Sequence, residues 1–233
     1  PIFCFLYTYD EIGGIMTLLE LSNISYIVKD KSIIRNVSLS VNQGDYITIV
    51  GPSGSGKSTL LKLCSDLISP TLGTITYNGR PLTAIDPESY RKEVGYCFQR
   101  PYLFAKTVHR NILFPYDIRG LEPDMSRIEY LFDLLHMPLN YMERRNDELS
   151  GGEMQRICLI RSLIFEPKVL LLDEVTSALD ATNTSIVENV IDELHKKGIT
   201  IISITHNEEQ SLRTANRRIT IVDGQLAKEE VLR

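Results

Sequence analysis

The first part of the chain alternates apolar and polar positions in the manner of β-strands. Residues 18–49 follow this pattern and are interrupted by turn sequences at residues 29–30 and 42–44, and residues 74–78 repeat it. Strands joined by short turns pair most simply in the antiparallel sense. The pattern therefore predicts an antiparallel β subdomain near the N-terminus.

The pattern then changes to an alternation of strands and helices. Residues 47–50 are a short β-rich run that ends in glycine, and residues 57–68 place apolar side chains at helical spacing before Ser69-Pro70. Four further elements are expected, namely a helix at 150–165, a strand at 169–172, a helix at 184–197 and a strand at 199–204. This order predicts an α/β fold with a mostly parallel central sheet flanked by helices.

Two further segments complete the expected organisation. Helical spacing dominates residues 101–149, as at 124–136, and indicates a helical subdomain inserted at about residues 101–160. Residues 1–15 are rich in aromatic side chains and lack both a basic region and a small-residue cleavage site, which argues against a signal peptide. We expect Met16 to be the natural start, residues 1–15 to be an extension outside the fold, and residues 16–233 to form one domain. The alternative is that residues 1–15 are an appendage packed on the surface.

Composition narrows the class of protein. The 233 residues are 43% hydrophobic and 24% charged, close to the average of globular chains, and the formal net charge of −5 provides no general basic surface for nucleic acid. No apolar run approaches the roughly 18–20 residues of a membrane-spanning helix, so a role at a membrane requires a partner. The four cysteines are scattered and fit reduced thiols that fill small apolar spaces: Cys4, Cys64, Cys97 and Cys158.

A glycine-rich loop joins the strand at 47–50 to the helix at 57–68. Residues 51–58, with the sequence GPSGSGKS, fit the pattern GxxxxGK[ST] in the context that it requires. The glycines let backbone N–H groups surround a polyphosphate, Lys57 reaches the β and γ phosphates, and Ser58 binds Mg²⁺. A chance glycine-rich turn is the alternative. The loop predicts that ATP and Mg²⁺ bind at Gly51, Pro52, Ser53, Gly54, Ser55, Gly56, Lys57, Ser58 and Thr59.

Two acids follow the apolar strand at 169–172. They are Asp173 and Glu174, at the strand end where parallel sheets collect their ligands. Asp173 suits the shell of Mg²⁺, and Glu174 is then free to orient a water molecule for attack on the γ-phosphate. A solvated acid at the end of a strand is the alternative for Glu174.

The helix at 150–165 begins with a capping box. In the sequence LSGGE, Ser150 is placed to cap the helix and Glu153 to return the hydrogen bond, while Gly151 and Gly152 leave backbone N–H groups open to an anion. On its own this pattern indicates only a capped helix.

Taken together, these motifs resemble the nucleotide-binding domain of ATP-binding cassette (ABC) transporters. The phosphate loop, LSGGE, VLLLDE, SALD at 177–180 and ITH ending at His206 occur in the family's order, and the resemblance spans about residues 18–226. It implies the fold of a P-loop NTPase, ATP hydrolysis coupled to transport, and a position at the inner face of the cell membrane through a partner.

The resemblance also implies roles for single residues. Tyr26 corresponds to an aromatic residue that stacks on adenine, although it could be an ordinary strand tyrosine. Gln99 corresponds to a glutamine that touches Mg²⁺ and senses the membrane partner. His206 corresponds to a histidine that contacts the γ-phosphate, and Asp180 to an acid that crosses a dimer interface.

In this family two copies pair head to tail, which implies an ATP-dependent homodimer. Ser150, Gly151 and Gly152 of one copy would close over ATP held by Lys57 of the other. The aromatic-rich segments 101–104 and 112–116 are candidates for the surface that receives a short helix of a separate transmembrane subunit. The alternative is that these side chains pack inside the helical subdomain.

The type of transporter is indicated by a shorter stretch. Residues 90–120 resemble a bacterial group of iron-export ATP-binding subunits whose partner is a separate membrane protein, which favours export. Two other classes remain as alternatives. A soluble ABC ATPase that acts on nucleic acid or ribosomes would carry a long coiled-coil insertion or a second cassette, and a phosphate-loop kinase would leave LSGGE and His206 without a purpose.

Overall fold

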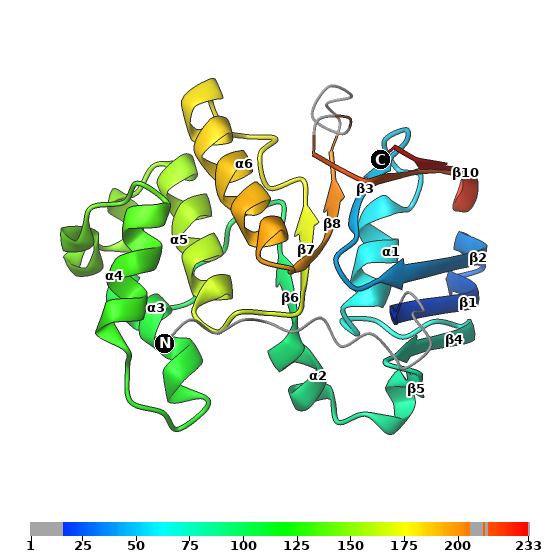
Figure 1. The fold of residues 1–233 in the computed structure, drawn as a ribbon, viewed down its shortest axis with the longest axis horizontal. Helices are drawn as coiled ribbons and strands as arrows, with labels where there is room; N and C mark the ends of the chain where they lie inside the picture. The colour runs from blue at the N-terminus through cyan, green and yellow to red at the C-terminus, as the bar shows by residue number, and fades with distance from the viewer. Residues whose placement is uncertain (1–15, 206–211, 213, 233) are drawn as a thin grey trace.

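The central element is a six-stranded sheet with the strand order β10-β9-β3-β8-β7-β6 (Figure 1). The structure is a computed structural model that describes residues 16–205, 212 and 214–232. Strands β9, β3, β8, β7 and β6 are parallel to one another, and only β10 pairs antiparallel. The strands are β3 (Tyr46–Val50), β6 (Val94–Cys97), β7 (Val169–Asp173), β8 (Thr200–Ile204), β9 (Arg217–Val222) and β10 (Gln225–Val231). The expected mostly parallel sheet is confirmed.

A second sheet of four strands lies beside the first, with the order β2-β1-β4-β5. All its pairs are antiparallel, as the alternation near the N-terminus predicts. Its strands are β1 (Thr17–Val28), β2 (Lys31–Asn42), β4 (Leu72–Tyr77) and β5 (Arg80–Pro81). The two sheets are joined through β2, β3 and the helix that follows β3.

The helices occupy both sides of the central sheet. They are α1 (Lys57–Cys64), α2 (Pro87–Glu93), α3 (Val108–Asp117), α4 (Met125–Leu134), α5 (Gly151–Leu163) and α6 (Ala181–Lys196). Three short 3-10 turns accompany them, namely η1 (Leu82–Ala84), η2 (Leu139–Glu143) and η3 (Asn146–Glu148). Helices α3 and α4 lie at the far left of Figure 1, beyond α5, and form the helical lobe that the sequence predicts between residues 101 and 149. None of the helices in the described part is long and apolar enough to cross a membrane.

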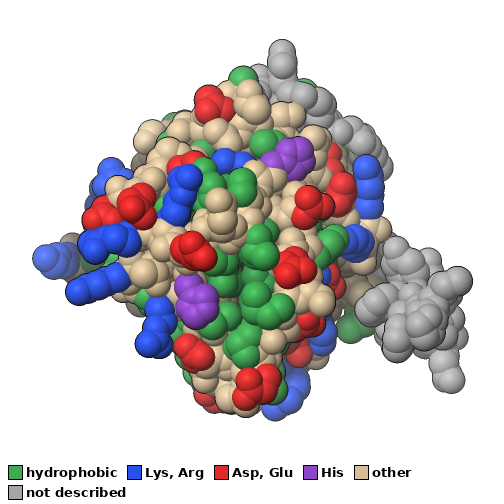
Figure 2. Space-filling view, turned by 90° about the vertical axis from the view of Figure 1, so that its left-hand side faces the viewer, with side chains coloured by type: hydrophobic (Ala, Val, Ile, Leu, Met, Phe, Trp, Pro, Cys, Tyr) green, Lys and Arg blue, Asp and Glu red, His purple; other side chains and the backbone are tan. Residues whose placement is uncertain are grey.

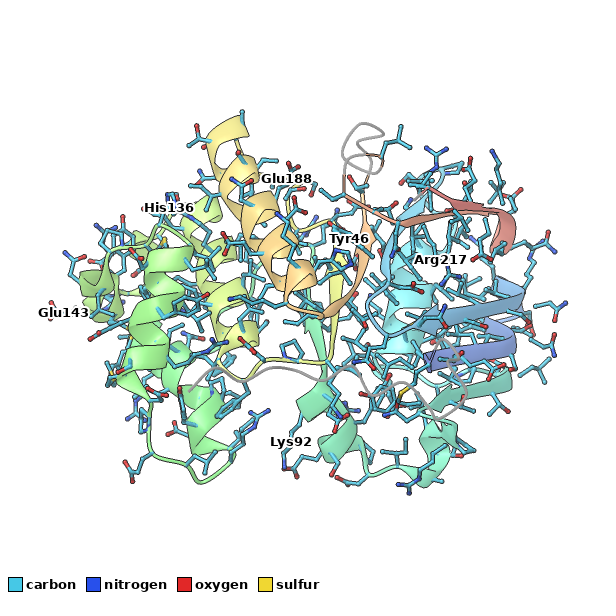
Figure 3. The ribbon with its side chains drawn as sticks, in the orientation of Figure 1. Tyr46, Lys92, His136, Glu143, Glu188 and Arg217 are labelled. Carbon is cyan, nitrogen blue, oxygen red and sulfur yellow. The ribbon has the colours of Figure 1, made fainter. Side chains whose placement is uncertain are left out.

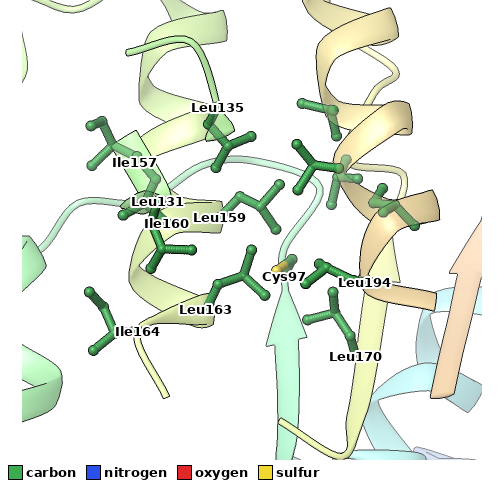
Figure 4. Packing of buried hydrophobic residues seen from close by; sticks show 14 of the residues in the cluster. Cys97, Leu131, Leu135, Ile157, Leu159, Ile160, Leu163, Ile164, Leu170 and Leu194 are labelled. Atoms are coloured by element: carbon green, nitrogen blue, oxygen red, sulfur yellow. The ribbon is translucent and has the colours of Figure 1, made fainter. Parts of the chain in front are cut away.

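Strands β3, β7 and β8 of the central sheet are buried on both faces, and their successive side chains point in opposite directions. In β7, Leu170 and Leu172 pack into a core with α3, α4, α5 and α6, part of which is shown in Figure 4. Val169 and Leu171 pack into a second core with α1 and the antiparallel sheet. Helices α1 and α5 therefore lie on opposite faces of the same strands.

Two sets of contacts hold the N-terminal ends of strands β3 and β9. Tyr46, the first residue of β3, packs edge-on against His195 of α6 with ring centroids 5.3 Å apart, and burial raises its pKa to about 12 (Figure 3). Arg217, the first residue of β9, makes ion pairs with both Asp45 and Glu229. These contacts hold helix α6 and the edge strand β10 against the inner strands of the central sheet.

Two predicted helix boundaries are wrong. The helix expected at 57–68 ends at Cys64, because Asp66 adopts a left-handed backbone with φ of 54° and the N–H of Leu67 turns back to the carbonyl of Lys62. The helix expected to begin at 184 begins at Ala181, capped by Asp180. The other expected strands and helices agree with the structure to within two residues. The predictions for residues 1–15 lie outside the described residues.

The outer side of the helical lobe carries apolar side chains. Figure 2 views the molecule from this side and shows a strip of hydrophobic side chains bordered by acidic ones. The three cysteines of the described ranges are elsewhere, buried and unpaired, as expected for small apolar fillers: Cys64, Cys97 and Cys158.

Candidate functional site

The loop between β3 and α1 has a backbone that only glycine can follow at its first position. Gly51 has φ of 139°, and a Cβ atom there would lie 2.0 Å from the carbonyl oxygen of Ile221 in β9. Gly54, at the exposed tip of the loop, has φ of 76° and open space beside it. The loop is therefore fixed against the sheet at its start and open to solvent at its tip.

A buried hydroxyl inside this loop has no protein partner. The Oγ atom of Ser55 makes no hydrogen bond to any described residue, although its backbone N–H is bonded to the carbonyl of Pro52 at 3.2 Å. A buried hydroxyl without a partner is unfavourable, and a phosphate oxygen is an acceptor that it could serve. The loop thus fits the polyphosphate that its sequence predicts.

Lys57 is the first residue of α1 and its ammonium group lies against the loop. Nζ donates to the carbonyl oxygens of Gly51 at 2.9 Å and of Pro52 at 3.0 Å, and the residue is only 5% exposed. Burial lowers the pKa of this ammonium group, while the negative charges of Glu174 and Asp173 raise it. A cation held beside the loop and two carboxylates is suited to a polyphosphate with its metal ion.

Ser58 and Asp173 meet at the C-terminal end of β7, although 115 residues separate them in sequence. Ser58 Oγ donates to Asp173 Oδ1 at 2.8 Å, and the aspartate is 4% exposed. Because the hydroxyl donates its hydrogen bond to the carboxylate, the lone pairs of Oγ stay available to a further partner. Hydroxyl and carboxylate oxygens are the ligand types that Mg²⁺ prefers.

Glu174 and Gln99 are also brought together. Gln99 Nε2 donates to Glu174 Oε2 at 2.5 Å, across 75 residues of sequence. Glu174 itself has φ of 50°, a left-handed conformation that is rare for a side chain of this size and that occurs most often at functional sites. The structure thus places Gln99 beside Glu174, directly after β7, and the contact of Gln99 with Mg²⁺ stays a prediction.

Tyr26 lies one strand away from the phosphate loop. It pairs with Ile34 of β2, and the Cδ1 atom of Ile34 lies 2.8 Å from where a Cβ on Gly56 would be. The ring of Tyr26 is half-buried against the second core. Its stacking on adenine stays a prediction.

The capping box at the start of α5 is confirmed. The backbone N–H of Ser150 donates to Glu153 Oε2 at 2.7 Å, and the N–H of Glu153 donates to Ser150 Oγ at 3.3 Å. Ser150 and Gly151 are exposed, and a Cβ on Gly151 would meet no atom within 4 Å. The start of this helix is therefore an open surface.

Asp180 caps the neighbouring helix α6. Its carboxylate accepts from the backbone N–H and from the side-chain amide of Asn183, both at 2.8 Å, and these bonds lower its pKa. The same amide nitrogen lies 3.2 Å from where a Cβ on Gly152 would be, so the first turns of α5 and α6 touch. The helix-capping role of Asp180 is an addition to the interface role that the resemblance implies.

The structure does not bring the LSGGE segment to the phosphate loop of the same chain. Helix α5 packs on the face of the sheet opposite α1, and Figure 1 shows the two helices on either side of strands β6, β7 and β8. Ser150 and Lys57 thus belong to separate surfaces of one chain. His206 lies outside the described residues.

Three residues of the site were not identified from the sequence. Tyr96 donates its hydroxyl to Asp173 Oδ2 at 2.7 Å, and burial together with this bond raises its pKa, so the hydroxyl stays the donor. Tyr141 donates to Glu153 Oε1 at 2.6 Å, and the guanidinium of Arg144 lies 3.6 Å from the centroid of the Tyr141 ring. No local motif marks these contacts, and the bond from Tyr96 to Asp173 spans 77 residues of sequence.

Comparison with known proteins agrees with this geometry. Residues 34–177 match the ABC transporter family. The chain belongs to the ABC transporter family. This ABC ATPase is 42% identical over 205 residues to the probable iron export ATP-binding protein FetA of Escherichia coli (strain K12), covering 88% of this chain and 91% of that protein.

Solved structures of ABC proteins have the same fold. One is a dimeric, post-hydrolysis state of the ATP-binding cassette MJ0796 bound to ADP and Pi, with a TM-score of 0.84 and 27% identity over 93% of this chain and 99% of that one. Another is a bacterial Atm1-family ABC exporter with ATP bound, with a TM-score of 0.82 and 25% identity over 93% of this chain and 39% of that one. The expected fold class and the assignment as an ATPase are therefore confirmed.

Proposed function

We propose that this ABC ATPase drives a separate transmembrane subunit and works as a head-to-tail homodimer that closes on ATP. The observation that carries the proposal is the separation of two surfaces on one chain. Lys57, Ser58, Asp173 and Glu174 gather at the end of the sheet, whereas the capped start of α5 at Ser150 is exposed on the other face. The first surface would bind the nucleotide and its metal ion, and the second would add hydrogen-bond donors for the phosphates. Two chains that pair head to tail would therefore complete two ATP sites.

The residues of the first surface would have separate roles in ATP hydrolysis. The loop N–H groups and Lys57 would bind the β and γ phosphates, with Thr59 in the next position of α1. Ser58, Asp173 and Gln99 would hold Mg²⁺, which neutralises developing charge on the phosphates when bound. Glu174, fixed by Gln99, would orient the attacking water and take up its proton.

The second surface would supply donors from the partner copy. Ser150 and the N–H groups of Gly151 and Gly152 stand at the positive end of the α5 dipole, which favours a phosphate group. The dimeric state of the related MJ0796 cassette supports this pairing. Asp180, beside Gly152, would lie at the same interface.

A groove on the side of the molecule suits the membrane subunit. It has a volume of about 320 Å³, lies between the α2–β6 segment and the α3–α5 pair, and has aromatic walls. Tyr102 is 69% exposed, and Phe104 and Phe114 pack edge-on with centroids 4.3 Å apart. Ile112 and Tyr116, in contrast, are buried in the lobe, so the alternative of packing inside the helical subdomain holds for these two residues. Lys92 stands at the rim of the groove (Figure 3).

The direction of transport and the cargo are inferred from relatives. FetA, 42% identical to this chain, is named a probable iron export ATP-binding protein, and we infer export, with a metal ion such as iron as the candidate cargo. Through its partner the chain would sit at the inner face of the cell membrane. The choice of cargo would then be made by the transmembrane subunit.

Replacing Glu174 tests the proposal. We expect Glu174→Gln to keep ATP binding and to lower turnover by about 10²–10⁴-fold, because the amide cannot accept a proton from water. ATP should convert this variant into a dimer, and exchange into ADP should return the monomer; both are measured by sedimentation velocity, with phosphate release measured without an added acceptor.

A second substitution provides the control for the dimer. Gly151→Asp adds a carboxylate at an open position where the helix start tolerates it, so the monomer should fold and bind ATP. In the Glu174→Gln background it should abolish the ATP-dependent dimer by placing a negative charge against the phosphates. A Glu174→Gln variant that stays monomeric with saturating ATP would contradict the head-to-tail site.

A further inference from the structure

The carboxylate of Asp173 is held by a different donor at each oxygen. Ser58 Oγ donates to Oδ1 at 2.8 Å, and the hydroxyl of Tyr96 donates to Oδ2 at 2.7 Å. Two donors on opposite sides of a buried carboxylate fix the rotation of its plane. The orientation of Asp173 is thus set by α1 on one side and by β6 on the other.

Tyr96 reaches Asp173 because of the register of β6 against β7. In the parallel ladder Tyr96 is opposite Leu171, two residues before Asp173. Its ring packs edge-on against Phe98 with centroids 4.7 Å apart, and both rings line the aromatic groove. The ring therefore fills space between the groove and the sheet, and only its hydroxyl reaches the site.

The ring packing of Tyr96 does not need the hydroxyl group. A phenylalanine would make the same ring contacts with Phe98, whereas the hydroxyl is directed at a single atom, Asp173 Oδ2. A hydrogen bond to a charged group is stronger than one between neutral groups. The bond to Asp173 is therefore the feature that requires a tyrosine at this position.

We propose that Tyr96 is a positioning residue for Mg²⁺ in the Mg·ATP site, because its hydroxyl holds Asp173 with Oδ1 beside Ser58. This inference rests on the proposed function, in which Ser58 and Asp173 hold the metal ion. Without the hydroxyl, Asp173 can turn away from Ser58, and the energy of turning it back reduces the affinity for the metal ion.

The test compares nucleotide binding with and without Mg²⁺. A non-hydrolysable fluorescent ATP analogue is titrated into the full chain in EDTA and over a series of Mg²⁺ concentrations. In the parent, Mg²⁺ should raise the affinity for the analogue. In Tyr96→Phe this gain should be about 10-fold or more smaller, the loss expected for one hydrogen bond to a charged group, while the affinity in EDTA is unchanged.

Tyr77→Phe is the matched control. Tyr77 lies on β4 and is buried in the second core, and its hydroxyl donates to the carboxylate of Glu93 at 2.7 Å, away from the phosphate loop. This variant loses the same type of bond, so it should lower the melting temperature while keeping the full effect of Mg²⁺. A double-mutant cycle with Asp173→Asn adds a second measurement, because Tyr96→Phe should have no further effect on the Mg²⁺ gain once the carboxylate is absent.

The outcomes separate this inference from the function on which it rests. A Tyr96→Phe variant with the parent's Mg²⁺ gain, or one that binds more weakly to the same degree with and without Mg²⁺, would overturn the positioning role. A parent that binds the analogue without any gain from Mg²⁺ would instead contradict the proposed metal site itself.

Discussion

Among single residues, Gly51 and Gly54 show how differently two glycines of one loop are constrained. A side chain at residue 51 would collide with the carbonyl oxygen of Ile221, whereas a side chain at residue 54 would meet nothing. We expect Gly51→Ala to lower the free energy of unfolding by about 3 kcal/mol or more, because the backbone of β9 must move. Gly54→Ala should lower it by about 1–2 kcal/mol, from its positive φ alone. Urea unfolding of both variants measures the difference, and equal effects would show that the loop does not pack on β9.

For single residues, the sequence predicts those parts of the site whose residues are neighbours along the chain. The phosphate loop and the pair Asp173-Glu174 are contiguous, so their spacing alone defines the chemistry. The family resemblance predicts that Gln99 touches Mg²⁺, whereas its hydrogen bond to Glu174, across 75 residues of sequence, is a finding of the structure. The bond from Tyr96 to Asp173 spans 77 residues and depends on the register of two strands, which no pattern within either strand specifies.

At the scale of elements, the start of α5 depends on a residue from outside the helix. The hydrogen bond from Tyr141 is the main cause of the lowered pKa of Glu153, and the bond from Ser150 and the charge of Arg144 act in the same direction. A carboxyl group whose pKa is lower in the folded than in the unfolded state adds stability at neutral pH, and this stability is lost as the pH falls through the folded pKa.

Tyr141→Phe tests this arrangement. We expect the variant to raise the pKa of Glu153 toward its ordinary value and to lower the free energy of unfolding at pH 7 by about 1 kcal/mol, a modest effect because the pair is partly exposed. The difference from the parent should shrink at acidic pH, below the ordinary range of a glutamate. Carboxyl NMR titration and urea unfolding at several pH values check both points. Tyr130→Phe is the control, since the Tyr130 hydroxyl accepts a hydrogen bond from the ammonium group of Lys197. An unshifted pKa of Glu153 in Tyr141→Phe would disprove the contact.

Helix ends show where patterns mislead. Leu67 and Ile68 continue the apolar spacing of α1, yet they follow a left-handed turn, with Leu67 in the groove and Ile68 against the second core. Leu67 is 42% exposed there, so only Ile68 is partly buried by the turn, and apolar spacing by itself does not require the helix to continue. Asp180 carries the signal for the true start of α6, because an aspartate is a favoured N-cap residue and its side chain caps this helix.

At the scale of the whole molecule, the strand order could not be obtained from the sequence. The alternation of strands and helices indicates a parallel sheet, but β3 lies between β8 and β9, which are far from it along the chain. Non-consecutive neighbours depend on how the complete set of helices covers both faces. The opposite placement of α1 and α5, on which the dimer proposal rests, is a result of this packing and not of any local signal.

The groove for the membrane subunit gives a prediction at the same scale. Tyr102→Ser removes exposed aromatic surface while the backbone carbonyl of residue 102 keeps its bond to Arg161. We expect the variant to keep the parent's basal ATP hydrolysis and melting temperature but to lose most of its co-purification with the transmembrane subunit. Leu139→Ser is the control, because Leu139 is similarly apolar and lies on the lobe outside the groove. Equal loss in both variants would show that the groove is not the specific docking surface.

The left-handed backbone of Glu174 has a consequence for how this ATPase can change. A non-glycine residue held in that conformation costs about 1 kcal/mol or more, and asparagine or glycine would relieve the cost. The substitutions expected to make the protein more heat-resistant at this position would therefore remove the carboxylate that we propose activates water. Under that proposal, thermostability and turnover are opposed at one residue, and a longer-lived form of this chain would have to gain its stability at other positions.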